Sequence, residues 1–254
     1  MFDLTGQVAV ITGASSGLGL QMAHGLAEHG AEVVLLARRK DKLEAAAADI
    51  TERWGVPAHA VPCDVTDLEQ IRNAVETCKQ WCNDIDILVN NAGAGGVVPA
   101  LEMTDEQWDW DLALDLTGVF RVIREFGREM VTTGKYGRII NIASMYGLVG
   151  NLAAPASAYH AAKGGVVNLT RALAAEWAPH GVTVNCLCPG YFETELTAET
   201  LATEEFQAHM DRTIPLRRHG KAGELNSACV FLAAKESSYI TGQIIAVDGG
   251  YTCV

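Results

Sequence analysis

Basic side chains are scarce in this sequence. The 254 residues contain 19 Lys and Arg against 31 Asp and Glu, which gives a formal net charge of -12 at pH 7. Nucleic acids and anionic membranes are bound by basic surfaces, because these attract phosphate charge. The charge balance therefore argues against both as main partners and favours a small-molecule ligand or substrate.

Long apolar runs and disulfide patterns are also missing. No segment reaches 18 uncharged apolar residues, and the first residues lack a basic stretch followed by a long apolar run, so we expect neither a membrane span nor an export signal. The 7 cysteines are odd in number, and their close pairs have no histidines at zinc-like spacing. We therefore expect reduced thiols, no metal site and a cytoplasmic protein.

Short apolar segments alternate along the chain with longer segments of helical pattern. The apolar segments read VAVIT, EVVLLA, HAVPC, IDILVN, GRIINIAS, VTVNCLC and QIIAV. Strands that are apolar throughout and separated by helices are typical of a parallel sheet covered on both faces. The pattern predicts an α/β fold with a doubly wound, seven-stranded parallel sheet in a single domain, residues 1–254. A less regular excursion at about 190–220 is typical of a binding loop.

A glycine-rich turn follows the first apolar segment, in the stretch VAVITGASSGLG. Glycines in such a turn permit a close backbone approach to a pyrophosphate, and the free N–H groups of the following helix attract its charge. The position after the first strand matches the dinucleotide-binding fingerprint. The predicted cofactor-binding residues of the turn are Gly13, Ser15, Ser16, Gly17, Leu18 and Gly19.

The end of the second apolar segment indicates which dinucleotide binds. An NAD-binding protein carries an acidic residue there, which bonds the ribose 2′-hydroxyl. Ala37 occupies that place in this chain, and Arg38 and Arg39 follow it. Guanidinium groups suit a 2′-phosphate, so we expect NADP rather than NAD and take Arg38 as the contact.

The stretch SAYHAAKGG places a tyrosine and a lysine one helical turn apart. Tyr159 and Lys163 share a helix face at this spacing, so the ammonium can stabilise the ionised phenol. A solvated surface pair has the same spacing. The pair by itself therefore does not identify an active site.

The chain resembles the short-chain dehydrogenases/reductases over essentially its whole length, through seven landmarks in the family's order. They are TGASSGLG, CDV, NNAG, the serine of IINIAS, YHAAK, PGYFET and YITGQIIAVDGG. The resemblance implies a Rossmann fold, a nicotinamide cofactor, a carbonyl or alcohol substrate and a homotetramer. The further cofactor-binding residues that it implies are Asp64, Val65, Asn91, Ala92, Gly93, Tyr159, Lys163, Pro189, Gly190 and Thr194.

The same resemblance implies three catalytic roles. Ser144 would hydrogen-bond the substrate oxygen, Tyr159 would be the acid/base, and Lys163 would hold the nicotinamide ribose. Hydride transfer to a ketone leaves an alkoxide that needs a proton, so one tunable acid must contact that oxygen. A lysine cation beside the phenol makes tyrosine usable near neutral pH.

One landmark departs from the family's pattern. In the long helical segment after the fourth strand, the family commonly has an asparagine whose backbone carbonyl holds a proton-relaying water, and Asp115 stands there in this chain. An anion near the phenol opposes the lysine. We therefore include Asp115 as a fourth catalytic candidate, and we expect it either to be protonated by burial or to shift the basic form of the enzyme to higher pH.

Two branches of the family look most similar, the 3-oxoacyl-carrier-protein reductases and the gluconate 5-dehydrogenase-type sugar-acid enzymes. Lys135 and His180 stand where the carrier-protein enzymes tend to place arginine, which weakens that branch. The segments expected to line the substrate site are mostly apolar, so a bulky or apolar carbonyl compound is as well supported as a sugar acid. Their large side chains are Tyr146, Tyr191, Phe192, Phe206 and Met210.

A function of another class is a regulatory protein that binds the cofactor without turnover. The intact serine, tyrosine and lysine argue against it. The sequence alone therefore predicts an NADP-dependent oxidoreductase that moves a hydride between the nicotinamide and a ketone or secondary alcohol.

Overall fold

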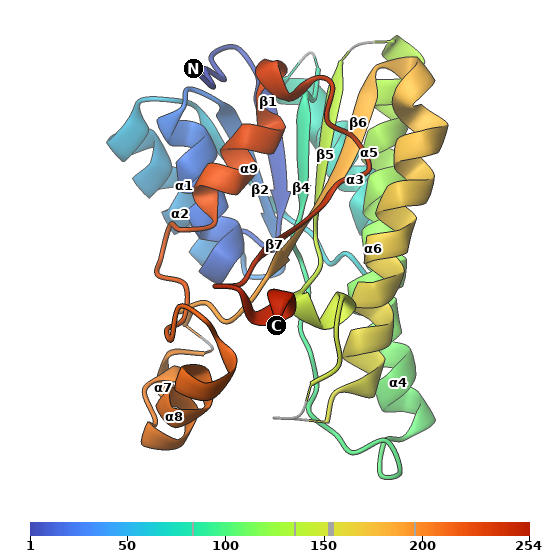
Figure 1. Ribbon diagram of the computed structural model, residues 1–254. Coiled ribbons are helices and arrows are strands. Elements are labelled where there is room, and N and C mark those ends of the chain that lie inside the picture. Colours follow the sequence, from blue (N-terminus) through green and yellow to red (C-terminus); the bar gives the residue numbers. More distant parts are fainter. Residues whose placement is uncertain (83, 135, 152–154, 196) are drawn as a thin grey trace.

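One parallel sheet forms the centre of the molecule (Figure 1). The computed structural model describes residues 1–82, 84–134, 136–151, 155–195 and 197–254. Within these residues seven parallel strands follow the order β3-β2-β1-β4-β5-β6-β7. The strands are β1 (Val8–Thr12), β2 (Glu32–Ala37), β3 (Ala58–Pro62), β4 (Ile87–Asn90), β5 (Gly137–Ile142), β6 (Val182–Pro189) and β7 (Ile244–Val247). Each predicted apolar segment forms one of them, so the predicted sheet is confirmed.

Helices cover both faces of this sheet. On one face lie α1 (Gly17–Glu28), α2 (Lys40–Trp54) and α9 (Asn226–Ala233). On the other lie α3 (Leu68–Trp81), α5 (Val119–Thr133) and α6 (Ser157–Trp177). The predicted doubly wound arrangement is therefore confirmed. In the described part of the chain, no helix combines the length and the apolarity that crossing a bilayer needs.

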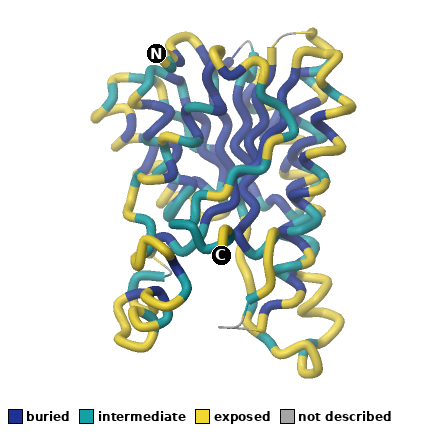
Figure 2. The backbone as a smooth tube through the Cα atoms, viewed as in Figure 1, coloured by how far each residue is buried: buried dark blue, intermediate teal, exposed yellow. Residues whose placement is uncertain are grey.

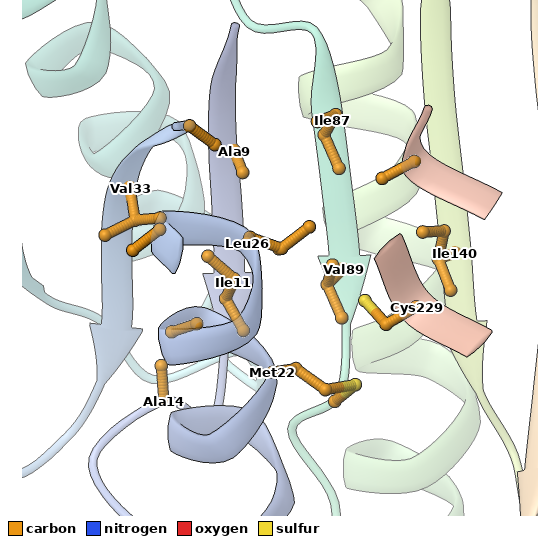
Figure 3. Close-up of a cluster of buried hydrophobic side chains, with 14 of the residues drawn as sticks. Ala9, Ile11, Ala14, Met22, Leu26, Val33, Ile87, Val89, Ile140 and Cys229 are labelled. Carbon is orange, nitrogen blue, oxygen red and sulfur yellow. The ribbon is translucent and has the colours of Figure 1, made fainter. Parts of the chain in front are cut away.

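Alternate residues of each strand point to opposite faces, and both faces are buried. Ala9 and Ile11 of β1 pack with Met22 and Leu26 of α1 in one cluster (Figure 3), whereas Val10 between them joins the cluster on the other face. The strands therefore run through the buried centre of the molecule (Figure 2). Burying one large aliphatic side chain contributes about 1.5–3 kcal/mol to the stability of the fold. The sheet is therefore a rigid support for the loops at its edge.

The loops at the carboxyl ends of the strands carry the less regular elements. The short helices α7 (Ala198–Leu201) and α8 (Glu204–Thr213) lie beyond this edge (Figure 1), so the excursion at about 190–220 is partly helical. The helix α4 (Asp105–Leu112) lies beyond the same edge. Its first turn is closed by a capping box between Thr104 and Gln107.

A π-helical segment, η1 (Ala113–Gly118), joins α4 to α5. A π turn holds one residue more than an α turn, so it changes the direction of the side chains that follow. The predicted long helical segment is thus three consecutive pieces, and Asp115 lies in the middle one.

Candidate active site

The glycine-rich turn joins β1 to α1 and is closed by Asn91. Gly13 has a φ of +67°, a left-handed conformation that favours glycine. Asn91 Nδ2 donates to the Thr12 carbonyl at 3.0 Å, and a Cβ at Gly13 would lie 2.8 Å from that Nδ2. A Cβ at Gly19 would lie 2.5 Å from the Gly13 carbonyl oxygen. The turn therefore has bare backbone at its glycine positions and leads into a helix N-terminus, a surface that fits a pyrophosphate.

Two cavities share this turn. Their volumes are about 260 Å³ and about 570 Å³, and Gly13, Ser16 and Gly93 line both. The other predicted residues that line the first cavity are Gly17, Leu18, Asn91, Ala92, Ser144, Tyr159, Lys163, Pro189, Gly190 and Thr194. Those that line the second are Ser15, Arg38, Asp64, Val65 and Ala92. The structure thus brings the predicted cofactor-binding residues together, and Gly19 supports the turn from beneath.

The predicted cofactor-binding residues lack several residues that line the second cavity, among them Arg39, Trp110 and Glu195. Arg39 donates from one guanidinium nitrogen to Ser15 Oγ at 3.0 Å and to Ser16 Oγ at 2.8 Å. Because Arg39 is next to Arg38 in the sequence, its place in the cofactor cavity could have been predicted. Glu195 also lines the first cavity, and only the folded chain brings it there.

Ser144, Tyr159 and Lys163 meet at the first cavity. Ser144 follows β5 and is 7% exposed, and its Oγ accepts a hydrogen bond from the Tyr146 N–H at 3.1 Å. Tyr159 and Lys163 lie on α6, with Lys163 Nζ 5.5 Å from the centroid of the tyrosine ring. Lys163 Nζ also donates to the Ile142 carbonyl at 3.3 Å. The serine that follows β5 and the two residues of α6 thus line the same cavity.

Asp115 is fully buried and forms an ion pair with Lys163. Its Oδ1 lies 2.9 Å from Lys163 Nζ, and its Oδ2 accepts from the Ala94 N–H at 3.3 Å. Burial raises the pKa of Asp115 above its usual range, although Lys163 pulls it down. Burial also opposes the charge on Lys163, but Tyr159 and Asp115 together raise the pKa of the ammonium. The aspartate therefore acts on the tyrosine through the lysine that both contact.

A third cavity, of about 720 Å³, begins at Tyr159, which also lines the first. Glu205, His209 and Arg212 of α8 line it at spacings of four and three residues, which is one helix face. Further polar groups in its wall are Tyr146, Asn151, Tyr191, Thr200 and Thr203. Of the five large side chains expected to line the substrate site, Tyr146, Tyr191 and Phe206 line this cavity, whereas Phe192 and Met210 do not.

The reason is the orientation of α8. Phe206 lines the cavity, but Met210 is 1% exposed and points into the protein. Phe192 is 5% exposed and packs against Gly220. The residue types of the excursion do not show which of its side chains are buried and which line the cavity. The helical periodicity of α8 does show this, because its polar residues share the face that lines the cavity.

Aromatic side chains close one wall of this third cavity. The hydroxyl groups of Tyr146 and Tyr191 lie 2.5 Å apart. The Tyr191 ring contacts Phe206 edge to face at 4.8 Å, and His160 stacks on Tyr146 at 4.7 Å. Burial raises the pKa of both tyrosines, so they remain neutral hydrogen-bonding groups.

In the described part of the chain, the remaining candidate His180 lines none of these three cavities. His180 is in a short turn after α6, and Lys135 lies outside the described residues. All 7 cysteines lie in described segments as free thiols, and Cys253 alone of these is exposed. Among the described residues no group of three or more His, Cys, Asp and Glu is arranged to hold a metal ion.

Comparison with known proteins places this geometry among dehydrogenases. The sequence profile of a family described as "Enoyl-(Acyl carrier protein) reductase" matches residues 13–252. Gluconate 5-dehydrogenase from Gluconobacter oxydans is 40% identical, and galactitol 2-dehydrogenase (L-tagatose-forming) from Cereibacter sphaeroides is 42% identical. Both alignments cover 99% of this chain and 97% of the relative.

A solved structure has the same architecture. The gluconate 5-dehydrogenase from Burkholderia cenocepacia, in complex with NADP and tartrate, superimposes with a TM-score of 0.94 at 36% identity. The match covers 100% of this chain and 98% of that one. That relative combines the same fold with a nicotinamide dinucleotide and a small hydroxy acid.

Proposed function

Because the chain belongs to the short-chain dehydrogenase/reductase family, we propose that it transfers a hydride between NADP and a secondary alcohol of a polyhydroxy acid or polyol. The chain is an oxidoreductase that depends on a nicotinamide cofactor, and NADP is that cofactor. The observation that carries the choice of substrate class is the polar face of α8 in the cavity beside Tyr159.

The cofactor would lie along the first two cavities. The turn from Gly13 to Gly19 would hold the pyrophosphate, and Arg38 with Arg39 would hold the 2′-phosphate, since no carboxylate stands at Ala37 to repel it. Asp64 would contact the adenine. Bound NADP supplies or accepts the hydride.

The proton chemistry is the work of the protein's own side chains. Tyr159 Oη would give its proton to the substrate oxygen in reduction and take it back in oxidation. Ser144 Oγ would donate a hydrogen bond to the same oxygen and stabilise charge that develops there. Lys163 would favour the ionised phenol by its charge, since it shares the cavity with Tyr159.

The substrate class follows from hydrogen-bonding capacity. A polyol or sugar acid carries a hydroxyl on nearly every carbon, and each must find a partner when it leaves water. Asn151, Glu205, His209 and Arg212 supply such partners in the third cavity. A long acyl chain would leave these groups unpaired, so a 3-oxoacyl substrate is the weaker candidate.

Steady-state kinetics test this substrate class. The purified enzyme is assayed for NADP⁺ reduction with gluconate and galactitol, and for NADPH oxidation with a 3-oxoacyl thioester. We expect a sugar acid or polyol to have the highest kcat/KM, and Tyr159→Phe to abolish that turnover. A higher kcat/KM for the thioester would favour the reductase alternative instead.

We also propose that the whole chain acts as one domain in a cytoplasmic homotetramer. Trp108, Trp110 and Phe120 are 37%, 49% and 40% exposed, and large aromatic side chains are enriched at interfaces. Free thiols persist in reducing compartments. Light scattering after size exclusion should give a mass near four times the 27.1 kDa of one chain, and a single-chain mass would contradict the proposal.

A further inference from the structure

One carboxylate lies in the wall of both cofactor cavities. Glu195 lines the first cavity with Thr194 and the second with Arg38 and Arg39. Every other described residue that lines the second cavity lies no later in the chain than Leu114, so Glu195 reaches this cavity from the distant loop after β6. An ionised carboxylate opposes the binding of a phosphate. A carboxylate at this place therefore works against a dinucleotide unless its charge is compensated.

The compensating charge comes from α2. Lys42 Nζ lies 2.8 Å from Glu195 Oε1 and 3.0 Å from Glu195 Oε2, so one ammonium bonds both carboxylate oxygens. Lys42 is in the first turn of α2, and 153 positions separate the two residues in the chain. The ion pair therefore joins the start of α2, which follows the two arginines directly, to the loop after β6.

The cations at this end of the site act on Glu195 together. Lys42 holds the pKa of Glu195 below its usual range, and Arg39 lowers it further. Arg39 is itself fixed beside the glycine-rich turn, because it bonds the hydroxyl groups of two serines there. Glu195 is therefore an ionised group in the field of cations that line or adjoin the second cavity.

Asp64, another carboxylate of the second cavity, is held differently. Its Oδ1 accepts from the Thr66 N–H at 2.9 Å and from the Thr66 hydroxyl at 2.7 Å. These partners belong to its own loop and are neutral. Glu195 differs because its bonded partner is a cation, which an incoming anion can also bind.

We propose that Glu195 tunes cofactor selection by competing with the 2′-phosphate of NADP for Lys42. The inference rests on the proposed placement of that phosphate at Arg38 and Arg39. A phosphate monoester carries a charge of about -1.5 to -2 near pH 7 and has three acceptor oxygens, so it is a stronger partner for an ammonium than a carboxylate is. Lys42 already contacts a group in the wall of the same cavity. Glu195 therefore lowers the affinity for NADP.

The pairing makes this effect specific to the 2′-phosphate. The Lys42–Glu195 pair has no net charge, so a dinucleotide with a 2′-hydroxyl leaves it intact. A 2′-phosphate takes the ammonium and leaves the carboxylate to water. The two side chains are 45% and 58% exposed, so water solvates the separated carboxylate and the effect is modest. Glu195 therefore reduces the preference for NADP over NAD without abolishing it.

Calorimetric titration with two fragments of the cofactor tests the competition without turnover. Adenosine 2′,5′-bisphosphate carries the 2′-phosphate, and adenosine 5′-monophosphate lacks it. We expect Glu195→Gln to lower the Kd of the bisphosphate about fivefold and Lys42→Gln to raise it about fivefold, the upper end for an exposed ion pair. The Kd of the monophosphate should change by less than about twofold. Both effects should shrink in salt of about 1 M, which screens exposed charges.

The double variant separates competition from simple repulsion. If Glu195 acts by holding Lys42, Glu195→Gln should not change the Kd of the bisphosphate once Lys42→Gln is present. An effect that persists in that background would overturn the competition. A single Glu195→Gln variant whose Kd for the bisphosphate equals or exceeds that of the parent would overturn it as well.

Glu199→Gln and Lys40→Gln are the matched controls. Glu199 is an exposed carboxylate of α7, and Lys40 is an exposed cation at the start of α2. In the described part of the chain neither residue lines a cofactor cavity, so both variants should bind the two fragments as the parent does. A control that shifts the Kd of the bisphosphate as much as its partner variant would overturn the proposal. Thermal unfolding shows that all variants keep the fold.

The result is separable from the placement of the cofactor. A parent that binds the bisphosphate no more tightly than the monophosphate contradicts that placement and the inference with it. A parent that prefers the bisphosphate, together with a Glu195→Gln variant that does not differ from it, overturns the inference alone. The proposed substrate class does not enter, because neither fragment undergoes a reaction.

Discussion

The glycine-rich turn of the cofactor site is one continuous stretch of the chain, Gly13 to Gly19, whereas the cavity beside Tyr159 is walled by side chains from distant segments. The first region depends on glycines at set positions. The second depends on which face α8 turns inward. A phosphate-binding turn of this kind can therefore be predicted from local sequence. The residues that line the proposed substrate cavity are brought together only by tertiary packing.

The largest expected effect lies where the two regions meet. Tyr159→Phe keeps the ring that lines both cavities and removes only the proton donor. We expect kcat to fall about a thousandfold, within the range for a positioned acid, while NADPH binds as in the parent. Turnover and NADPH fluorescence are measured on one preparation. Activity within tenfold of the parent would contradict the role of Tyr159.

The cofactor region is tested by changing the end of β2. Ala37→Asp combined with Arg38→Ala and Arg39→Ala supplies a partner for a 2′-hydroxyl and removes the guanidinium groups that line the second cavity. We expect the ratio of kcat/KM for NADPH over NADH to fall about a hundredfold, since charge-assisted contacts are lost.

Lys40→Ala is the control for this change, because it removes an exposed cation at the start of α2. Its cofactor preference should equal that of the parent. A triple variant that still prefers NADPH would show that the 2′-phosphate is held elsewhere.

The proposed substrate region is tested by replacing Arg212 on the face of α8 that lines the third cavity. Arg212→Gln should raise KM for gluconate about tenfold and leave KM for galactitol nearly unchanged, because only the acid has a carboxylate to bond a guanidinium. Arg171→Gln makes the same change on the exposed side of α6 and should alter neither value. Equal changes for both substrates would mean that Arg212 does not recognise the carboxylate.

The smallest effect concerns the charge behind Lys163. Asp115→Asn keeps an oxygen acceptor for the lysine and removes an anion, so the positive charge beside Tyr159 is less compensated. The ionised phenol is then stabilised, and the basic limb of the kcat/KM profile for alcohol oxidation should move to lower pH by up to about one unit.

This profile is measured for parent and variant at the same salt and at high buffer concentration, so that proton supply is not limiting. The fold should be retained, as followed by thermal unfolding. A limb that does not move would contradict an ionised Asp115.

The strands and the glycine-rich turn were predictable because their signals are local. Continuous apolar strands indicated a doubly covered parallel sheet, and the glycine turn of Gly13 to Gly19 follows the first of them directly. Arg39 could have been predicted in the same way, because it follows Arg38 directly. Glu195 was not, because it lies far along the chain from the other groups that line the second cavity.

The sequence by itself determined the sheet, the glycine-rich turn and the placement of Tyr159 and Lys163 on one helix, because strand apolarity, glycine spacing and helical spacing act over a few residues. Only the tertiary structure decided what surrounds them. It turned Glu205, His209 and Arg212 toward the substrate cavity and Met210 away from it. It also placed Asp115 against Lys163, through a π turn and a glycine loop that leave room for the pair. These contacts join residues far apart in the chain, and the packing of helices over the sheet edge, which no local pattern encodes, sets their distances.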